Sequence, residues 1–559
     1  MQLSTTKVII IITLVGMLVL GKVIFNSFVG DDPGYIFHPY IQNFQLAKLF
    51  IGSSADLGGS SPITGQFYRP LMLTAFSFIF LLFGKTAAYY HLFQLVFHII
   101  NAILIFLLLK KFSSKLVPLV LSLLFLVHPI NVETFAYVSN FQDTLFMFFG
   151  LSALLFLLKK KQTFINFLVI LFLLFCSLLS KESGILFVTL VVSYLLIIKR
   201  CRNALYYFSI FGLTIIYLLV RLGIANVGFT NSALSPIGHL SFIERVQMMP
   251  EIVSYYLLTF ILPINLAIGQ VWIGTNNVYP IIPPATVFIL SVAITTFAVL
   301  LFKTDRKSFS EYIFFMVWFV LGIALHLQIV PLEMTVADRW FYFPFVGLLG
   351  MIAVVLKKTI TRRNEYLLYS VAIIIILIFA IRSFIRLGDW KDAITLYSHD
   401  TKVTKSYLLE HSLGFELMEK ERMDEALVHL QKSVAIYQTP FNSNSMGVYF
   451  YKLKDHKRAV LWFEKSISSG DYYLSFSNLS NLHLETKDYR KAAIVLEQAT
   501  DKFPDSSVFY HKLSIAEYKN GNMKKALDAA ISAYNISKSS ENEYIFRQLI
   551  DGKDINIKD

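Results

Sequence analysis

Cysteine is nearly absent from this 559-residue chain, which holds only Cys176 and Cys201. Cys176 lies inside an apolar run, and Cys201 lies in a basic loop. Two thiols placed in this way cannot build a disulfide framework or a cysteine-based metal site. The count therefore excludes redox chemistry that depends on cysteine pairs.

Charge is also scarce, because only 16% of the residues are Asp, Glu, Lys or Arg, against about 25% in ordinary soluble proteins. Hydrophobic residues make up 55% of the chain, and the mean hydropathy is +0.59. A chain this apolar is neither disordered nor an ordinary soluble protein. Long, nearly uncharged runs recur up to about residue 382, and the chain then becomes rich in Lys and Glu. These features predict a polytopic membrane region followed by a soluble tail.

The apolar runs are long enough to count as membrane spans, since about 20 helical residues cross the roughly 30 Å hydrocarbon core. The sequence predicts eleven spans, near residues 7–29, 91–109, 116–128, 140–158, 164–180, 182–198, 205–222, 283–302, 312–330, 341–356 and 365–382. The first run is too long for the apolar part of a signal peptide, so we interpret it as a retained span. Two further stretches, 70–83 and 251–269, are left open between a span and a re-entrant segment.

Lys and Arg gather in every second loop between these runs, which marks the cytoplasmic face by the positive-inside rule. The clusters are Lys110, Lys111 and Lys115; Lys159, Lys160 and Lys161; Lys199, Arg200 and Arg202; Lys303, Arg306 and Lys307; and Lys357, Lys358, Arg362 and Arg363. A net crossing by 251–269 would place the last two clusters outside, so we expect that stretch to be re-entrant or interfacial. The amino terminus is then inside, and everything after about residue 383 is outside. Because much of the net charge of +13 lies in these loops, it does not indicate a nucleic-acid partner.

The predicted outer face collects most of the ionisable residues of the membrane region, which are costly near a bilayer and usually functional. They are Asp31, Asp32, Arg69, His91, His128, Glu133, Lys181, Glu182, Arg221, Glu333, Asp338 and Arg339. Structural alternatives exist, because Lys181 and Arg221 at helix ends would snorkel to the interface and His91 would bond to a neighbouring helix. Because all of these residues fall on the same predicted face of the membrane, a functional site is favoured.

Small residues recur in the tail at a spacing of 33 or 34 residues, the tetratricopeptide period. They are Ala393, Ala426, Ala459, Ala492 and Ala526, each of the last four preceded by a pair such as Leu413–Gly414 or Met446–Gly447. The sequence therefore predicts an all-α chain with a polytopic membrane domain over 1–388, whose first outer loop spans 30–69, and a tetratricopeptide-repeat solenoid over 389–559. Such arrays bind extended peptides or partner proteins; the alternative is a stability cap or dimer contact.

Familiar catalytic motifs are missing, since the sequence has no phosphate-cradling Gly-rich loop, no zinc-binding HExxH and no nucleophile elbow. Asp31-Asp32-Pro33-Gly34 directly follows the first span. Desolvation at a membrane boundary raises the pKa of a carboxyl, which suits a general base near neutral pH. The same four residues also favour a simple turn, and this alternative stays open.

Several motifs together resemble the transmembrane and tetratricopeptide-repeat family of C-type glycosyltransferases, relatives of the protein O-mannosyltransferases. In chain order they are Asp31-Asp32, Tyr68-Arg69-Pro70-Leu71, His91 with Gln94, His98 and Asn101, the HPxxxE element His128 to Glu133 with Ser139 and Asp143, the ADRxxxxP element Ala337 to Pro344, and Trp390-Lys391-Asp392. The resemblance covers nearly the whole chain. The chain departs from the family at Gln94, where Asn is frequent, and at Trp340, where Tyr is common.

The resemblance implies that a sugar, mannose or another hexose, moves from a polyprenyl-phosphate donor to a Ser or Thr hydroxyl of a protein on the non-cytoplasmic face, with inversion. Asp31 would be the base and Asp32 its neighbour. Because the charge of a leaving phosphate is stabilised by cations, the donor phosphate is assigned to Arg69, Arg339, Lys181 and Arg221. The acceptor or sugar is assigned to His91, His128, Glu133 and Asp338, and Asp338 is also expected to orient Arg339.

No cofactor or metal is expected, because the outer face lacks a clear cluster of three carboxylates, although His128 and Glu133 would suit a divalent cation. Two alternative functions remain, a C-type transferase that modifies glycolipids or lipid-linked glycans, and a non-catalytic membrane-anchored repeat scaffold. Eleven crossings are more than anchoring requires. Richness in Lys, Ile, Asn and Phe and no recognisable retention signal favour a bacterial cytoplasmic membrane with the repeats outside or periplasmic. The alternative is the endoplasmic reticulum membrane with luminal repeats.

Overall fold

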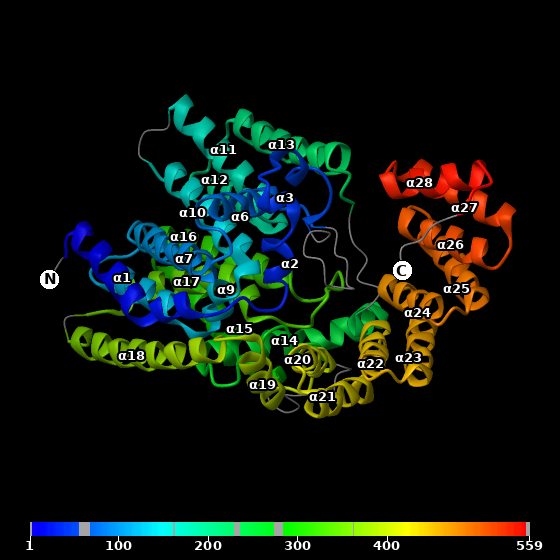
Figure 1. Ribbon diagram of the computed structural model, residues 1–559. Helices are drawn as coiled ribbons and strands as arrows, with labels where there is room; N and C mark the ends of the chain where they lie inside the picture. The colour runs from blue at the N-terminus through cyan, green and yellow to red at the C-terminus, as the bar shows by residue number, and fades with distance from the viewer. Residues whose placement is uncertain are drawn as a thin grey trace. The chain divides into compact units, whose positions relative to one another are not determined.

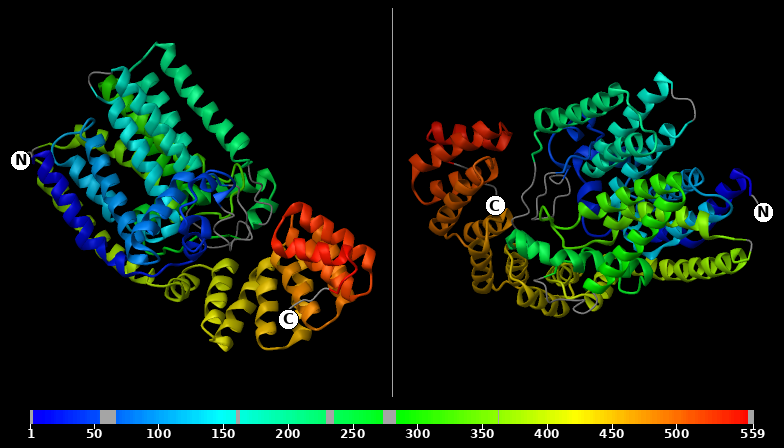
Figure 2. Two further views of the ribbon diagram at one scale, coloured as in Figure 1. Left: turned by 45° about the horizontal axis from the view of Figure 1, so that its top comes forward. Right: turned by 180° about the vertical axis from the view of Figure 1, so that it is seen from behind.

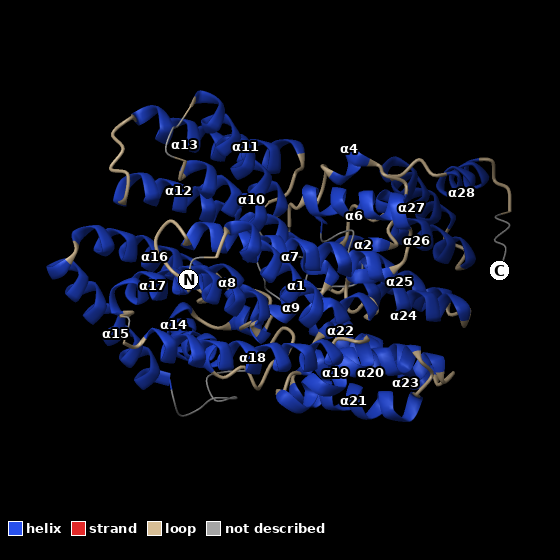
Figure 3. Ribbon diagram, turned by 90° about the vertical axis from the view of Figure 1, so that its left-hand side faces the viewer, coloured by secondary structure: helices blue, strands red, loops and turns tan. Residues whose placement is uncertain are grey.

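The computed structural model describes residues 3–54, 67–159, 163–228, 235–272, 283–361 and 363–554. Over these ranges the regular structure is helical, with no strand and one isolated bridge between Gln270 and Val336 (Figure 3). Part of the predicted outer loop 30–69, three of the basic loop residues (Lys160, Lys161 and Arg362) and the carboxyl-terminal residues 555–559 lie outside the described residues. The chain divides into two compact units, Met1–Lys405 and Ser406–Asp559 (Figure 1).

The first unit contains the helices up to α19. They are α1 (Thr5–Leu20), α2 (Asp32–Ile36), α3 (Pro39–Gln42), α4 (Leu46–Leu49), α6 (Pro70–Phe83), α7 (Ala87–Leu109), α8 (Val117–Val127), α9 (Val132–Ala136), α10 (Phe141–Leu157), α11 (Phe164–Ser180), α12 (Ile185–Ile197), α13 (Ala204–Leu219), α14 (Phe242–Ile261), α15 (Pro283–Thr304), α16 (Arg306–Ala324), α17 (Tyr342–Thr359), α18 (Glu365–Asp389) and α19 (Ala393–Val403). Short helical turns at Glu182–Gly184 and Asp338–Phe341 precede α12 and α17.

Eight helices in the described ranges are long and apolar enough to cross a membrane, so the first unit is an integral membrane domain. A ninth arises if α8 and the segment Pro129–Ala136, bent by 51°, form one span, and three apolar helices are shorter. Each of the eleven predicted spans falls on one of these helices, but the number of crossings stays a prediction. The stretch 251–269 is not one continuous helix, because α14 ends at Ile261.

Local sequence signals explain where several helices begin. Pro70, which has no amide hydrogen to leave unpaired, is the first residue of α6. Ser241 and Glu244 form a capping box at the start of α14, and Asp305 accepts hydrogen bonds from the first amides of α16. Small residues then let helices approach closely: a Cβ atom on Gly347 of α17 would lie 2.5 Å from the backbone nitrogen of Phe319 on α16.

The second unit is a stack of antiparallel helix pairs, shown in yellow to red in Figure 2. Its helices are α20 (Tyr407–Glu419), α21 (Met423–Ile436), α22 (Pro440–Lys452), α23 (His456–Ser469), α24 (Tyr473–Glu485), α25 (Tyr489–Lys502), α26 (Ser507–Lys519), α27 (Met523–Ile536) and α28 (Ser540–Ile550). The periodic residues Ala426, Ala459, Ala492 and Ala526 are all 0% exposed. A Cβ atom on Gly414 would lie 2.8 Å from Leu430, the larger residue that fills the same hairpin. The predicted fold class, a helical membrane domain followed by a tetratricopeptide-repeat solenoid, is confirmed.

The position of α19 differs from the sequence interpretation, which placed the domain boundary at 388/389. The compact units meet between Lys405 and Ser406, so α19 belongs with the membrane unit. A buried ion pair explains this, because Arg386 of α18 and Asp400 of α19 are 2% and 0% exposed and lie 2.7 Å apart. Period and composition alone do not reveal such a tertiary contact.

Candidate active site

The four predicted phosphate-binding cations lie in one region of the first unit, and each contacts a carboxylate. Arg69, at the start of α6, and Arg221, beyond α13, both face Glu182, at distances of 3.3 and 3.6 Å. Lys181 Nζ lies 2.6 Å from Asp143 Oδ1 on α10. Because the segments that carry these groups are far apart in sequence, the fold builds the cluster.

Arg339 is paired with Glu133, which contacts both its guanidinium and its backbone amide. Asp338, which was expected to orient Arg339, instead accepts a hydrogen bond from the hydroxyl of Tyr255. Both Glu133 and Asp338 are buried. Glu133 is therefore the carboxylate that holds Arg339, and the role expected for Asp338 stays a prediction.

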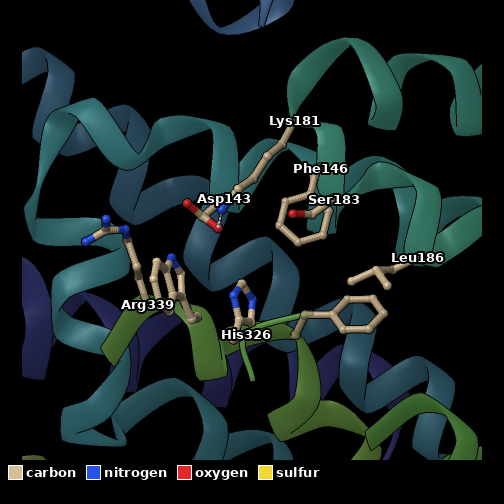
Figure 4. A pocket seen from close by; sticks show the side chains of 9 residues that line it. Asp143, Phe146, Lys181, Ser183, Leu186, His326 and Arg339 are labelled. Atoms are coloured by element: carbon tan, nitrogen blue, oxygen red, sulfur yellow. Dashed lines mark hydrogen bonds and ion pairs between the residues drawn. The ribbon is translucent and has the colours of Figure 1, made fainter. Parts of the chain in front are cut away.

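A small cavity lies beside the Lys181–Asp143 pair. In Figure 4 the side chain of Lys181 extends to Asp143. Two further lining residues are His326, just after α16, and Arg339, in the helical turn before α17. The remaining lining residues are Phe146, Ser183, Leu186, Trp340 and Phe343. The cavity thus combines two cations and one carboxylate with an apolar wall.

His326 and Ser183 line this cavity but were not singled out from the sequence. The ring of His326 stacks on Trp340, with centroids 4.7 Å apart and planes at 9°. His326 falls inside the predicted span 312–330, and an ionisable residue within an apolar run is itself a signal of function. That signal would have identified His326, whereas Ser183 carries no comparable mark.

Asp31 and Asp32 have different surroundings. Asp32 is 0% exposed, and its Oδ1 accepts hydrogen bonds from the backbone amide and the hydroxyl of Ser139, both at 2.6 Å. Its Oδ2 accepts one from the amide of Val29 at 3.0 Å. Burial raises the pKa of Asp32 to about 7, although the hydrogen bonds from Ser139 and Val29 oppose the rise. Both oxygens of Asp32 are therefore committed to holding the loop.

Asp31 occupies the half-buried position at the start of α2. Its backbone amide donates a hydrogen bond to the hydroxyl of Tyr137 at 3.0 Å. Asp32 is thus enclosed, whereas Asp31 is only half-buried.

Glu333 is a further carboxylate of the region, named from its sidedness but given no role from the sequence. Its Oε1 is buried and has no hydrogen-bond partner among the described residues. Burial raises the pKa of Glu333 to about 7, with Arg69 and Arg339 acting against the rise and Asp31 adding to it. Glu333 is thus electrostatically coupled to both the cations and the acidic pair.

His128 and His91 lie in packed surroundings. His128 Nε2 is 2.9 Å from the carbonyl oxygen of Phe260, its Nδ1 accepts a hydrogen bond from the amide of Ile130, and its ring stacks on Phe260. This placement favours a structural role at the bend after α8 and gives no support to sugar binding by His128. His91, on α7, is 0% exposed.

No group of three or more His, Cys, Asp or Glu residues in the described ranges is arranged to hold a metal ion. The pairs Asp143–Lys181 and Glu133–Arg339 instead place a basic group against each carboxylate. The ionic contacts of the site are thus between side chains of opposite charge.

The resemblance to protein O-mannosyltransferases is confirmed by comparison with known proteins, although no family model matches the chain. The chain is 24% identical over 404 residues to a protein O-mannosyl-transferase of Caenorhabditis elegans, an alignment that covers 68% of this chain and 55% of that protein. The chain therefore spans about half the length of this relative.

Among solved structures, ArnT from Cupriavidus metallidurans bound to undecaprenyl phosphate is 12% identical, with 77% of this chain and 76% of that chain covered and a TM-score of 0.41. The Archaeoglobus fulgidus oligosaccharyltransferase tethered with an acceptor peptide is 12% identical, with 76% and 58% covered and a TM-score of 0.39. MamA from Desulfovibrio magneticus is 19% identical, with 26% and 84% covered and a TM-score of 0.24.

Proposed function

We propose that the chain is a glycosyltransferase that moves a sugar, mannose or another hexose, from a polyprenyl-phosphate donor to a Ser or Thr hydroxyl of a protein. The observation that carries the proposal is the gathering of Arg69, Lys181, Arg221 and Arg339 in the membrane unit that also positions Asp31. The sequence similarity to a protein O-mannosyl-transferase supports it.

The donor phosphate is assigned to the side of Arg69 and Arg221. Lys181 and Arg339 each face a carboxylate of their own, whereas Arg69 and Arg221 share Glu182. Glu182 is also the most accessible of these carboxylates, with 27% of its side chain exposed. Because two guanidinium groups face one carboxylate, the three side chains carry a net charge of +1. This positive charge stabilises the negative charge on a leaving phosphate.

Asp31 acts as the general base in this proposal. Its carboxylate accepts the proton of the acceptor hydroxyl while the hydroxyl oxygen bonds to the anomeric carbon. The bond from that carbon to the phosphate oxygen breaks, and the phosphate leaves with the electron pair. Because attack and departure take place on opposite sides of the carbon, the configuration inverts.

In this proposal the reaction takes place on the non-cytoplasmic side. By the positive-inside rule the loops rich in Lys and Arg face the cytoplasm, and Asp31 and the repeats lie on the other side. The isoprenoid tail of the donor stays in the bilayer, and the repeat solenoid binds the polypeptide acceptor. The membrane is the bacterial cytoplasmic membrane, with the endoplasmic reticulum as the alternative.

The test is transfer of radiolabel from polyprenyl-phosphate mannose, with other lipid-linked sugars in parallel, to protein in membranes that contain the wild type or Asp31→Asn. Asp528→Asn, at an exposed position of α27, is the matched control. We expect label in protein with the wild type and the control, and none with Asp31→Asn.

The other outcomes favour the other functions. Asp31-dependent label confined to lipid would favour a glycolipid-modifying transferase. The absence of Asp31-dependent label from any donor, with both proteins folded, would favour the scaffold.

A further inference from the structure

The loop that leads to Asp31 is held by a segment more than 350 residues away in the sequence. Asn26 Nδ2 donates a hydrogen bond to the carbonyl oxygen of Leu387 at 3.1 Å, over a separation of 361 residues. The amide of Ser27 donates to the carbonyl oxygen of Lys391 at 2.9 Å. The chain just before the proposed base is therefore attached to the end of α18 and the turn before α19.

Two tyrosine hydroxyls converge on the turn at Gly30 and Asp31. Gly30 has a φ of +54°, and a Cβ atom there would lie 2.7 Å from the hydroxyl of Tyr137 and 3.2 Å from that of Tyr397. The hydroxyl of Tyr137 accepts the hydrogen bond from the amide of Asp31. Glycine is needed here both for its left-handed backbone conformation and because the hydroxyls leave no room for a side chain.

Trp390 packs against Tyr137, and α19 carries Tyr397. Trp390 is 1% exposed, and its ring centroid lies 5.9 Å from that of Tyr137. Tyr397 is carried by α19, which is fixed by the bidentate contacts of Asp400 with Arg386 at 2.7 and 3.0 Å. Asp400 Oδ2 also accepts a hydrogen bond from the amide of Ile268 at 2.7 Å. The support is thus built from α18, α19 and the segment after α14.

We propose that Tyr137, Trp390 and Tyr397 are positioning residues that set the placement of Asp31 for proton transfer. The helix read from the sequence as the first repeat element is then part of the catalytic unit. The inference rests on the proposed function, in which Asp31 is the base. The hydroxyl of Tyr137 bonds to the amide of Asp31, Trp390 packs on Tyr137, and Tyr397 faces Gly30, so loss of these residues acts first on the rate of the chemical step.

The test compares Tyr137→Phe with Tyr90→Phe in the full-length protein. Tyr90 is a matched control, because it is buried like Tyr137 and its hydroxyl donates one hydrogen bond, to the carbonyl oxygen of Gly84 at 3.0 Å. We expect Tyr137→Phe to lower kcat about tenfold, since small misplacements of a catalytic group cost about 10- to 100-fold in rate. The KM for the donor should stay within about twofold of the wild-type value, and Tyr90→Phe should leave both constants unchanged.

If Tyr137→Phe unfolds, variants of Trp390 test the same inference. Trp390→Phe retains an aromatic ring against Tyr137 and should keep more of the wild-type kcat than Trp390→Ala. Wild-type kcat in Tyr137→Phe and Trp390→Ala, with Asp31→Asn inactive, would overturn the inference and leave the proposed function intact. A rise in KM together with a lowered thermal transition would assign these residues a merely structural role. Full activity of Asp31→Asn would overturn the proposed function itself.

Discussion

Lys181 Nζ lies 2.6 Å from Asp143 Oδ1, and the two side chains are only 11% and 3% exposed. A pair this deeply buried is stable only when both charges are present, because a single buried charge without its partner is strongly destabilising. The second oxygen of Asp143 has no hydrogen-bond partner among the described residues. The pair therefore leaves one carboxylate oxygen available in the wall of the cavity.

The first prediction follows from this pairing. Lys181→Ala should destabilise the protein by about 3–5 kcal/mol, the usual cost of leaving one member of a buried ion pair alone. Lys181→Ala combined with Asp143→Asn should recover part of that loss, because no uncompensated charge remains. Thermal unfolding in detergent measures both. A double variant that is as unstable as the sum of the two single variants would contradict the coupling.

The acidic pair supports the second prediction, because its two members differ in surroundings. Asp32→Asn places an amide NH₂ against an amide hydrogen-bond donor, from Ser139 or Val29, and should cost about 1–3 kcal/mol of stability. Asp31→Asn should cost less, although it abolishes transfer in the proposed mechanism. Ser139→Ala removes the hydroxyl donor and keeps the amide donor, so its loss of stability should lie between those of Asp31→Asn and Asp32→Asn. Equal thermal transitions for Asp31→Asn and Asp32→Asn would show that Asp32 does not hold the loop.

The helices and repeats were predictable because their signals are local in the sequence. An apolar run of sufficient length predicts a membrane-spanning helix by itself, and the recurrence of Ala426, Ala459 and Ala492 predicts helix hairpins without any knowledge of the fold. The grouping of α19 with the membrane unit could not be predicted for a related reason. Ala393 fits the repeat pattern, whereas tertiary contacts such as that of Asp400 with Arg386 tie its helix to the membrane unit.

The partners of the charged residues could not be predicted, although the residues themselves could. Glu182 follows Lys181 directly in the sequence, yet it pairs with Arg69 over a separation of 113 residues, and Lys181 pairs with Asp143. Hydropathy and motif order place such groups on one side of the membrane. They do not indicate which carboxylate meets which cation, because that depends on how the helices pack.

The third prediction uses the raised pKa of Glu333, which burial brings to about 7. Above pH 7 the carboxylate is charged and competes with the donor phosphate for Arg69; below pH 7 it takes up a proton and the competition ends. The KM for the donor should therefore fall about fivefold from pH 8 to pH 6, which corresponds to a charge interaction on the order of 1 kcal/mol.

Glu333→Gln should remove this pH dependence and keep the low KM at both pH values. Glu251→Gln, a change at a half-buried position of α14, is the control and should titrate like the wild type. A variant Glu333→Gln that retained the full pH dependence of KM would assign it to another group.

The fourth prediction concerns the repeats, whose compact unit begins at Ser406. A chain that ends at Lys405 should use a short Ser- or Thr-containing peptide as the full-length chain does, because the cations and Asp31 all lie in the first unit. Its KM for a folded protein acceptor should rise about tenfold, equivalent to a loss of about 1.4 kcal/mol of binding. Parallel kinetics with the two acceptors measure the difference.

A point variant tests the same role in the complete chain. An added side chain at Gly447 of α22 would overlap the ring of Phe463 on α23, so Gly447→Val should distort one repeat and raise the KM for protein acceptors alone. Gly212→Val on α13 is the control, since nothing lies within 4 Å of a Cβ atom at that position. Equal loss of transfer to protein and peptide in both the shortened chain and Gly447→Val would contradict acceptor binding by the repeats, because the membrane unit would then need an intact solenoid for its own activity.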